Sequence, residues 1–321
     1  MTRLTHWLRG SLAALACGVL AFGTAHAGAP MVKTQAPGYY RLMVGDFEVT
    51  ALFDGALDLQ PTKLLTHTTP SQVTQLLGRS FEKEPLPTSV NAYLINTGSK
   101  LVLVDTGAGA LFGPALGGLT NNVKAAGYQP EQVDEIYITH MHGDHVGGLV
   151  SAGKPAFANA VVRADQHDVD YWLSAANAEK APAEMRDFFK AAVSAFTPYM
   201  EAGRFKPFDG DTDLVPGVRA VAAHGHTPGH TVYVVQSAGQ KLVLWGDLMH
   251  VAAVQFPQPQ VTISFDSDSK AAAAQRKKAY AEAAKEGYLV GAAHLPFPGL
   301  GHLRSEGKGY RFVPVDYAPV K

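Results

Sequence analysis

The segment His140-Met141-His142-Gly143-Asp144-His145 carries the clearest potential for chemistry in this sequence. Three imidazoles and one carboxylate fall within six residues, directly after the apolar and β-branched run that ends at Thr139. A tight loop after a strand can turn all four side chains toward one small volume. Imidazole and carboxylate groups are ligands that zinc and related divalent ions accept. This spacing is specific where a single histidine would not be, and it predicts a metal site.

Several further polar residues lie at the ends of apolar runs. Asp105, His140, Asp247 and His294 each end such a run. If these runs are strands, their polar ends gather at one edge of the sheets, on loops fixed by a rigid scaffold. The arrangement predicts a functional site at that edge.

Runs of β-forming residues alternate with helical patterns along the chain. We expect strands over residues 40–52, 90–97, 101–105, 135–140, 160–164, 218–223, 231–236, 242–247 and 288–294. We expect helices over residues 116–126, 168–177, 183–196 and 270–286, the last capped by residues 266–269 and ended by Gly287. Alternation of the two kinds predicts a layered α/β protein, and the hairpin-like early runs require antiparallel pairing as well.

The first 27 residues predict an export signal. Arg3 and Arg9 precede an apolar run over residues 12–22, and Ala25-His26-Ala27 forms a small-x-small cleavage site. A membrane anchor is the less favoured alternative, because a spanning helix needs roughly 20 apolar residues. We therefore expect residues 28–321 to form one mature domain that is periplasmic or secreted, without stable membrane association.

The composition of the mature chain limits its partners and ligands. Of the 27 Lys and Arg residues two lie in the signal, which leaves 25 against 28 Asp and Glu and a net charge of -3. This balance favours neither nucleic acid nor an anionic membrane surface. The single cysteine, Cys17, also lies in the signal. Any metal in the mature protein is therefore bound by nitrogen and oxygen.

The histidine-rich segment resembles the signature of the metallo-β-lactamase superfamily. Further landmarks follow in the family's order, namely Val104-Asp105-Thr106-Gly107, Gly225-His226-Thr227-Pro228-Gly229-His230, Gly246-Asp247 and a strand that ends in His294. Within the superfamily, residues 36–41, 96–107, 292–299 and 307–314 are similar to methyl parathion hydrolase and its lactonase-like relatives. The resemblance implies a four-layer αββα sandwich over residues 28–321.

The resemblance also implies a site for two divalent metal ions. One ion is bound by His140, His142 and His226, the other by Asp144, His145 and His294, and Asp247 bridges both. Zinc is the default ion, with manganese, iron or cobalt as alternatives. Asp105 is expected behind the metal loop, where it orients a ligand or the backbone.

Other histidines compete with these ligands by position. The family's ligand directly precedes the Thr-Pro-Gly turn, which selects His226 over His224 and His230, and His302 lies in a glycine-rich loop. We expect these three to support the ligands through hydrogen bonds. His67 and His167 are expected at the surface.

Several aromatic residues correspond to the substrate pocket of the methyl parathion hydrolase group. The expected pocket residues are Phe112, Trp172, Phe188, Phe189, His250 and Phe265. Without the resemblance, ordinary core packing would be the better interpretation of the first four. An aromatic, uncharged wall favours small apolar or aromatic esters and lactones.

The leading function is hydrolysis of lactones or aryl esters by a metal-bridging hydroxide, with Asp247 and His250 as catalytic residues. Hydrolysis of organophosphate triesters, as in methyl parathion hydrolase, is the alternative. His250 stands where that relative carries leucine, and Phe265 is bulkier than its counterpart, so both restrict a tetrahedral triester. A non-catalytic periplasmic metal-binding protein is less favoured, because seven ligands with a bridging carboxylate leave open positions for water. A homodimer is compatible with the sequence.

Overall fold

The computed structural model describes residues 29–320, so the predicted signal and Cys17 lie outside the described residues. Residues 29–36 contain neither helix nor strand and belong to one unit. Residues 37–320 belong to a second unit, which contains every described element. None of the described helices is long and apolar enough to cross a membrane.

The first sheet has six strands in the order β1-β2-β4-β5-β6-β9. Their bounds are β1 Tyr39–Val44, β2 Phe47–Leu59, β4 Leu86–Asn96, β5 Leu101–Val104, β6 Glu135–Tyr137 and β9 Val161–Arg163. The strands pair antiparallel from β1 to β5 and parallel from β5 to β9. All four residues of β5 are buried, as expected of a strand that is covered on both faces.

The second sheet has seven strands in the order β10-β11-β12-β13-β15-β16-β17. Their bounds are β10 Thr212–Val215, β11 Val218–Ala222, β12 Thr231–Ser237, β13 Gln240–Leu244, β15 Leu289–Gly291, β16 Leu300–Glu306 and β17 Gly309–Pro314. Only β13 and β15 pair parallel. Apolar side chains of both sheets, among them Val49, Val104, Tyr233 and Leu242, form one cluster between them.

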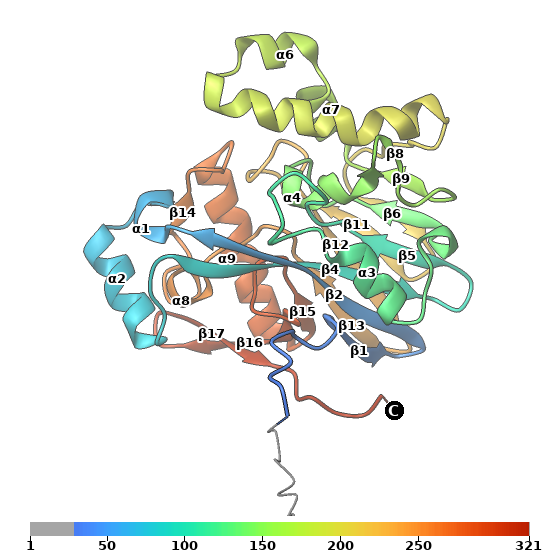
Figure 1. Cartoon of the computed structure of the whole chain (residues 1–321). Helices are drawn as coiled ribbons and strands as arrows, with labels where there is room; N and C mark the ends of the chain where they lie inside the picture. The colour runs from blue at the N-terminus through green and yellow to red at the C-terminus, as the bar shows by residue number, and fades with distance from the viewer. Residues whose placement is uncertain (1–28, 321) are drawn as a thin grey trace, which may run out of the picture. The chain divides into compact units, whose positions relative to one another are not determined.

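Helices cover the outer face of each sheet (Figure 1). On the first sheet lies α3 (Leu119–Ala125), while α7 (Arg186–Glu201) lies beyond α4 (Gly143–Val146) at the top of the view in Figure 1. Buried residues of α3, α7 and α5 (Gln166–Trp172) share a cluster with Leu94 and Leu103. On the second sheet lies α9 (Ser269–Glu286), whose Tyr280 stacks on Trp245 at 5.3 Å between ring centroids. This order of layers confirms the predicted αββα sandwich.

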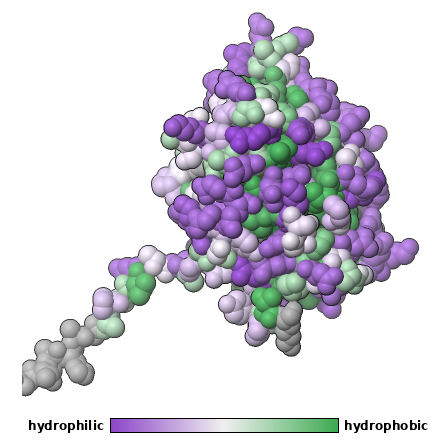
Figure 2. Space-filling view, turned by 90° about the vertical axis from the view of Figure 1, so that its right-hand side faces the viewer, coloured by the Kyte–Doolittle hydropathy of each residue, from purple (hydrophilic) through white to green (hydrophobic). Residues whose placement is uncertain are grey.

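Smaller elements complete the fold. The helices α1 (Pro61–Leu64), α2 (Pro70–Arg79) and α8 (Ala252–Gln255) pack together with the pair β3 (Leu65–Thr66) and β14 (Thr262–Ile263). The remaining short segments are α6 (Ala175–Lys180), β7 (Val150–Ser151), β8 (Lys154–Pro155) and the 3-10 turns Pro130–Gln132, Gly147–Leu149 and Ala183–Met185. Hydrophilic residues cover most of the face drawn in Figure 2, as expected of a protein whose apolar residues are enclosed between layers.

The structure differs from the predicted elements at several turns. The run 40–52 is a hairpin, because Gly45 adopts a left-handed φ of 57° and reverses the chain after β1. The helix expected over 168–177 divides into α5 and α6, since the Ser174 side chain accepts a hydrogen bond from Asn177 and starts a new helix there. β10, β16, β17 and α2 were not predicted.

Candidate metal centre

The loop after β6 and the short helix α4 present four of the predicted ligands. His140 and His142 lie on the loop, and Asp144 and His145 lie within the single turn of α4. Glycine follows because the chain turns back under a neighbouring loop: a Cβ at Gly148 would overlap the carbonyl oxygen of Thr106. Glycine at this position is therefore required by the close approach of two backbone segments.

The other three predicted ligands come from the second sheet. His226 follows β11, Asp247 follows β13 and His294 follows β15. All of these elements end at the same edge, so residues far apart in sequence meet there. The structure gathers one group of His140, His142, His226 and Asp247 and another of Asp144, His145 and His294.

The carboxylate of Asp247 lies between the two groups. Its Oδ2 atom is 3.6 Å from His140 Nε2, 3.4 Å from His226 Nε2 and 3.2 Å from His294 Nε2. Its Oδ1 atom is 3.3 Å from His145 Nε2. Donors that surround a shared tetrahedral ion at about 2.0–2.2 Å lie roughly 3.3–3.6 Å from one another. The separations match those of ligands around shared cations.

Buried atoms without partners support this fit. The Nε2 atoms of His140, His142 and His145 and Oδ1 of Asp247 are buried and have no hydrogen-bond partner among the described residues. Buried polar atoms are normally paired, and four unpaired ones in one small volume point to a missing partner. A set of imidazole and carboxylate donors is the chemistry that a divalent cation satisfies.

The pKa values of the ligand imidazoles shift in both directions. Burial and neighbouring imidazoles hold the pKa values of His140 and His142 well below the usual range, so both rings are neutral, the form that binds a metal. Burial also lowers the pKa of His226, but hydrogen bonds and charges of Asp247 and Asp266 outweigh it and raise the pKa to about 9. Metal binding at His226 would displace that proton.

Two buried carboxylates contact the far side of ligand imidazoles. Asp105 Oδ2 is 2.9 Å from Nδ1 of His145, and Asp266 Oδ1 is 2.8 Å from Nδ1 of His226. Such contacts fix the ring orientation and increase ligand basicity. Asp266 was interpreted from the sequence as part of a helix cap, but the cap of α9 is Asp268. The available signal was that Asp266 lies two residues before the cap, where it has no role in starting the helix.

Backbone groups orient two other residues. His294 Nδ1 lies 2.9 Å from the carbonyl oxygen of Ser89, which positions it to donate. His230 Nε2 accepts a hydrogen bond from the backbone N–H of Asp247 at 3.0 Å. Burial lowers the pKa of His230 to about 3, which keeps that nitrogen free to accept. His230 therefore supports the ligand Asp247, in the kind of role expected for it.

Two buried aspartates that the sequence reading missed connect the loops of the site. Asp168 accepts hydrogen bonds from Met141 N at 3.0 Å, Thr227 Oγ1 at 3.0 Å and Gly229 N at 2.6 Å. It therefore links the two histidine-bearing loops. Asp54 accepts from three backbone N–H groups of the loop that carries Phe112. Asp168 begins a predicted helix and Asp54 follows a predicted strand by two residues, so neither gave a separate signal.

Two histidines do not occupy the expected supporting positions. His224 lies 3.6 Å from Asp165, away from the ligands, because the turn at Gly225 separates it from His226. His302 is exposed and lies 3.0 Å from the carbonyl oxygen of Gly287 at the end of α9. The expectation that both support the metal ligands was wrong. His67 and His167 are exposed, as expected.

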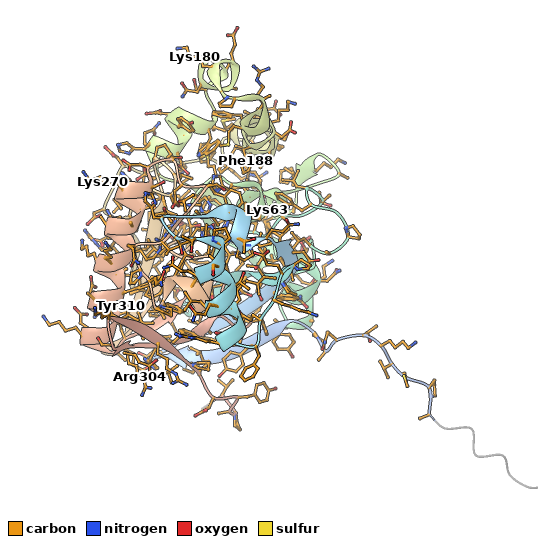
Figure 3. All side chains as sticks on the ribbon, turned by 90° about the vertical axis from the view of Figure 1, so that its left-hand side faces the viewer. Lys63, Lys180, Phe188, Lys270, Arg304 and Tyr310 are labelled. Atoms are coloured by element: carbon orange, nitrogen blue, oxygen red, sulfur yellow. The ribbon has the colours of Figure 1, made fainter. Side chains whose placement is uncertain are left out.

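A cavity of about 200 Å³ opens onto the metal centre. Its lining residues are Leu57, Asp58, Leu59, Thr88, Phe112, His142, Asp144, Phe188, Asp247, His250, Phe265 and His294. None of these described lining residues is Lys or Arg. In Figure 3 Phe188 is labelled on the α7 side of this region. Its apolar walls come from four different parts of the chain.

Two predicted pocket residues do not line this cavity. Trp172 is fully buried behind His142, with 5.2 Å between ring centroids. Phe189 packs on Trp172 at 4.8 Å and faces the core. Consecutive residues of a helix point about 100° apart, so Phe188 and Phe189 cannot both face the cavity. For Trp172 and Phe189 the prediction was wrong, and core packing is the correct interpretation.

His250 lies at the floor of the cavity, beside Asp247. Its Nε2 atom is 3.0 Å from Asp247 Oδ2, and its ring stacks on His294 at 5.1 Å. The ring of Phe265 lies 6.1 Å away and continues the wall. Burial lowers the pKa of His250 to about 4. His250, Asp247 and His294 also form a third group of converging ligand atoms.

Comparisons with known proteins agree with this geometry. Residues 85–294 match the metallo-beta-lactamase superfamily. The solved hydrolase AbOPH, described as a member of the beta lactamase superfamily, is 37% identical with a TM-score of 0.85, over 89% of this chain and 100% of that one. AidC, a dizinc quorum-quenching lactonase solved with the product N-hexanoyl-L-homoserine, is 26% identical with a TM-score of 0.82, over 88% of this chain and 99% of that one.

Among curated proteins, an N-acyl homoserine lactonase from Bacillus sp is 27% identical over 173 residues. That alignment covers 48% of this chain and 61% of the lactonase. The chain thus spans about three fifths of this relative's length.

Proposed function

This chain belongs to the metallo-β-lactamase superfamily, and from that premise we propose that it is a binuclear metal-dependent hydrolase of lactones or aryl esters. The observation that carries the proposal is the position of Asp247, whose carboxylate lies within 3.2–3.4 Å of ligand nitrogens from both groups at the floor of an apolar cavity. We further propose zinc as the ion, since AidC is a dizinc enzyme. Manganese, iron or cobalt remain alternatives for the group that contains Asp144. Export to the periplasm or the medium is part of the proposal.

In this proposal each ligand group would hold one cation, with Asp247 as a ligand of both. When bound, the cations would lower the pKa of a water ligand and polarise the carbonyl group whose carbon is attacked. Asp105 and Asp266 contact the Nδ1 atoms of His145 and His226, and so keep the Nε2 atom of each ring directed toward the metal centre. His250 lines the cavity and places its Nε2 3.0 Å from Asp247 Oδ2, where it can orient that carboxylate beside the substrate. Asp144 and Asp247 both line the cavity, and either carboxylate could take the proton that the attacking water loses and pass it to the leaving oxygen.

The cavity supports a small, neutral substrate. At about 200 Å³ it is smaller than the roughly 300–1,000 Å³ of sites that enclose drug-sized ligands. Its carboxylates, including the exposed Asp58 at the rim, meet no cationic side chain among the lining residues. A substrate that carries its own negative charge lacks a counter-ion from the protein there. A lactone ring or an aryl ester fits these conditions.

Hydrolysis of aryl phosphotriesters is the second candidate. It uses the same metal chemistry, but His250 and Phe265 reduce the space beside Asp247 for three substituents around phosphorus. These two side chains are the reason to place it second.

A substrate panel tests the proposal. Purified chain is assayed with an aliphatic lactone, an aromatic lactone, an aryl acetate and an aryl dimethyl phosphorothioate, before and after chelation. We expect kcat/KM to be highest for a lactone or the acetate, and expect all activity to be lost on chelation and restored by zinc. Faster turnover of the phosphorothioate would reverse the order of the two candidates. Absence of turnover in protein with full metal content would leave a metal-binding protein without hydrolase activity.

A further inference from the structure

A second group of potential metal ligands lies outside the metal centre. Asp165, His167 and His224 each offer one ligand atom, and these atoms lie within 4.8 Å of one another. Asp165 directly precedes α5, His167 is in its first turn, and His224 is on the loop that carries His226. The three residues therefore meet across two segments that are distant in sequence.

The geometry of this group resembles that of the metal centre. The imidazole rings of His167 and His224 are 4.7 Å apart between centroids. In the metal centre the ring of His226 is 4.7 Å from that of His140 and 4.8 Å from that of His142. Both rings face the carboxylate of Asp165, so the two imidazoles and one carboxylate converge as ligands of one ion would.

Asp165 completes the set as a buried oxygen donor. Its side chain is fully buried, while those of His167 and His224 are 53% and 33% exposed. Asp165 Oδ1 is 2.9 Å from His167 Nδ1, and Oδ2 is 3.6 Å from His224 Nε2. The first distance is that of a hydrogen bond, and the second is too long for one but suits two ligands of one ion. Because the His167 side chain is exposed, its ring can rotate so that Nε2, which does not contact Asp165, faces an ion.

A buried nitrogen of His224 adds to this support. His224 Nε2 is buried and has no hydrogen-bond partner among the described residues, although it faces Asp165. Asp209, which is 83% exposed, has Oδ1 3.9 Å from His167 Nδ1 and can supply a further oxygen by rotating its side chain. Two imidazoles and one or two carboxylates form a donor set that zinc accepts, with water in an open position.

We propose that Asp165, His167 and His224 form a third divalent-metal site, selective for zinc-like ions and open to solvent. The inference does not depend on the proposed hydrolase activity. A bound ion would join α5 to the loop just before His226, and Asp168 of the same helix already contacts Thr227 in that loop. Because this site has fewer protein ligands than the metal centre, its ion is bound more weakly than the other two.

Metal counting tests the site. Untagged full chain is dialysed to retain only its tightly bound metal, then equilibrated with increasing free Zn²⁺, and bound zinc is measured by elemental analysis. We expect wild type to bind one more equivalent than His167→Ala at saturation. His302→Ala is the matched control, since His302 is an exposed histidine beside backbone carbonyls, with no carboxylate among its hydrogen-bond partners. It should bind as many equivalents as wild type.

Two results would overturn the inference. Wild type that takes up no equivalent beyond its tightly bound metal has no third site. A further equivalent that persists in both His167→Ala and His224→Ala is bound elsewhere. Because the readout is the difference between wild type and variant, failure here leaves the metal count of the centre itself unaffected.

Discussion

The contact between Asp266 and His226 allows a sharp test of how the metal centre is oriented. Asp266 Oδ1 lies 2.8 Å from His226 Nδ1, and its Oδ2 accepts a hydrogen bond from Ile263 N at 3.1 Å. Its side chain is fully buried. Asp266→Asn keeps the size of the side chain and one oxygen but removes the charge. We expect the variant to fold and to bind the ion at His226 more weakly.

The expected magnitude follows from the role of such partners. Loss of a carboxylate behind a ligand imidazole typically weakens metal binding about 10 to 100-fold. Since a tenfold change corresponds to about 1.4 kcal/mol, the loss is about 1.4–2.8 kcal/mol. Asp268→Asn is the matched control, because Asp268 caps α9 through the backbone N–H of Ala271, and asparagine is as effective a cap as aspartate.

Competition with a chromophoric chelator measures the zinc affinity of wild type and both variants. Urea unfolding of the metal-free proteins checks that each folds. We expect Asp268→Asn to remain within twofold of wild type in affinity and Asp266→Asn to fall by at least tenfold. Wild-type affinity in Asp266→Asn would refute the claim that this carboxylate orients His226. An equal loss in both variants would refute the choice of Asp266 over its neighbour.

Other predictions concern individual histidines and the central carboxylate. Asp247→Asn should reduce kcat/KM by more than 100-fold, since Asp247 faces both ligand groups. His224→Ala and His302→Ala should retain near wild-type lactone hydrolysis. An inactive but metal-replete His302→Ala would contradict this. Burial holds the pKa of His230 at about 3 in the folded protein, below its ordinary value near 6.5, so its contribution to stability is present above pH 6.5 and is lost as the pH falls toward 3. Urea titrations of the metal-free protein should show a shallower loss of unfolding free energy on acidification in His230→Gln than in wild type. His250→Leu removes a polar ring from the cavity floor and should raise phosphotriester turnover relative to lactone turnover by roughly 10 to 200-fold; an unchanged ratio of kcat/KM values would leave His250 without a role in specificity.

The layers of the fold could be predicted from the sequence, because hydrophobic patterns and turn glycines determine the structure of the residues around them. The β-rich runs before Asp105, His140, Asp247 and His294 became strands whose ends meet, as their shared pattern indicated. The hairpin β16–β17 was missed because most of its side chains are exposed, so burial left little alternation to read. The capping box of Thr69 and Gln72 before α2 was a readable signal that was overlooked.

The candidate site divides in the same way between local and long-range information. The order of ligands could be read from short motifs, whereas their partners could not. Asp266 and Asp168 contact segments 40 and 59 residues away along the chain, a relation that only tertiary packing sets. The face of α7 on which each aromatic residue lies determines its role. Phe188 faces the cavity and Phe189 faces the core, and the sequence of the pair does not show which of the two does so.

Metal content measured together with activity tests the central proposal most directly. Untagged chain is dialysed against metal-free buffer, its metal is removed stepwise with a chelator, and elemental analysis and lactone hydrolysis are followed on the same samples. We expect two tightly bound ions per chain, with hydrolysis lost on their removal and recovered when two equivalents of zinc are restored. Full hydrolysis by protein that holds one ion per chain, or none, would contradict it.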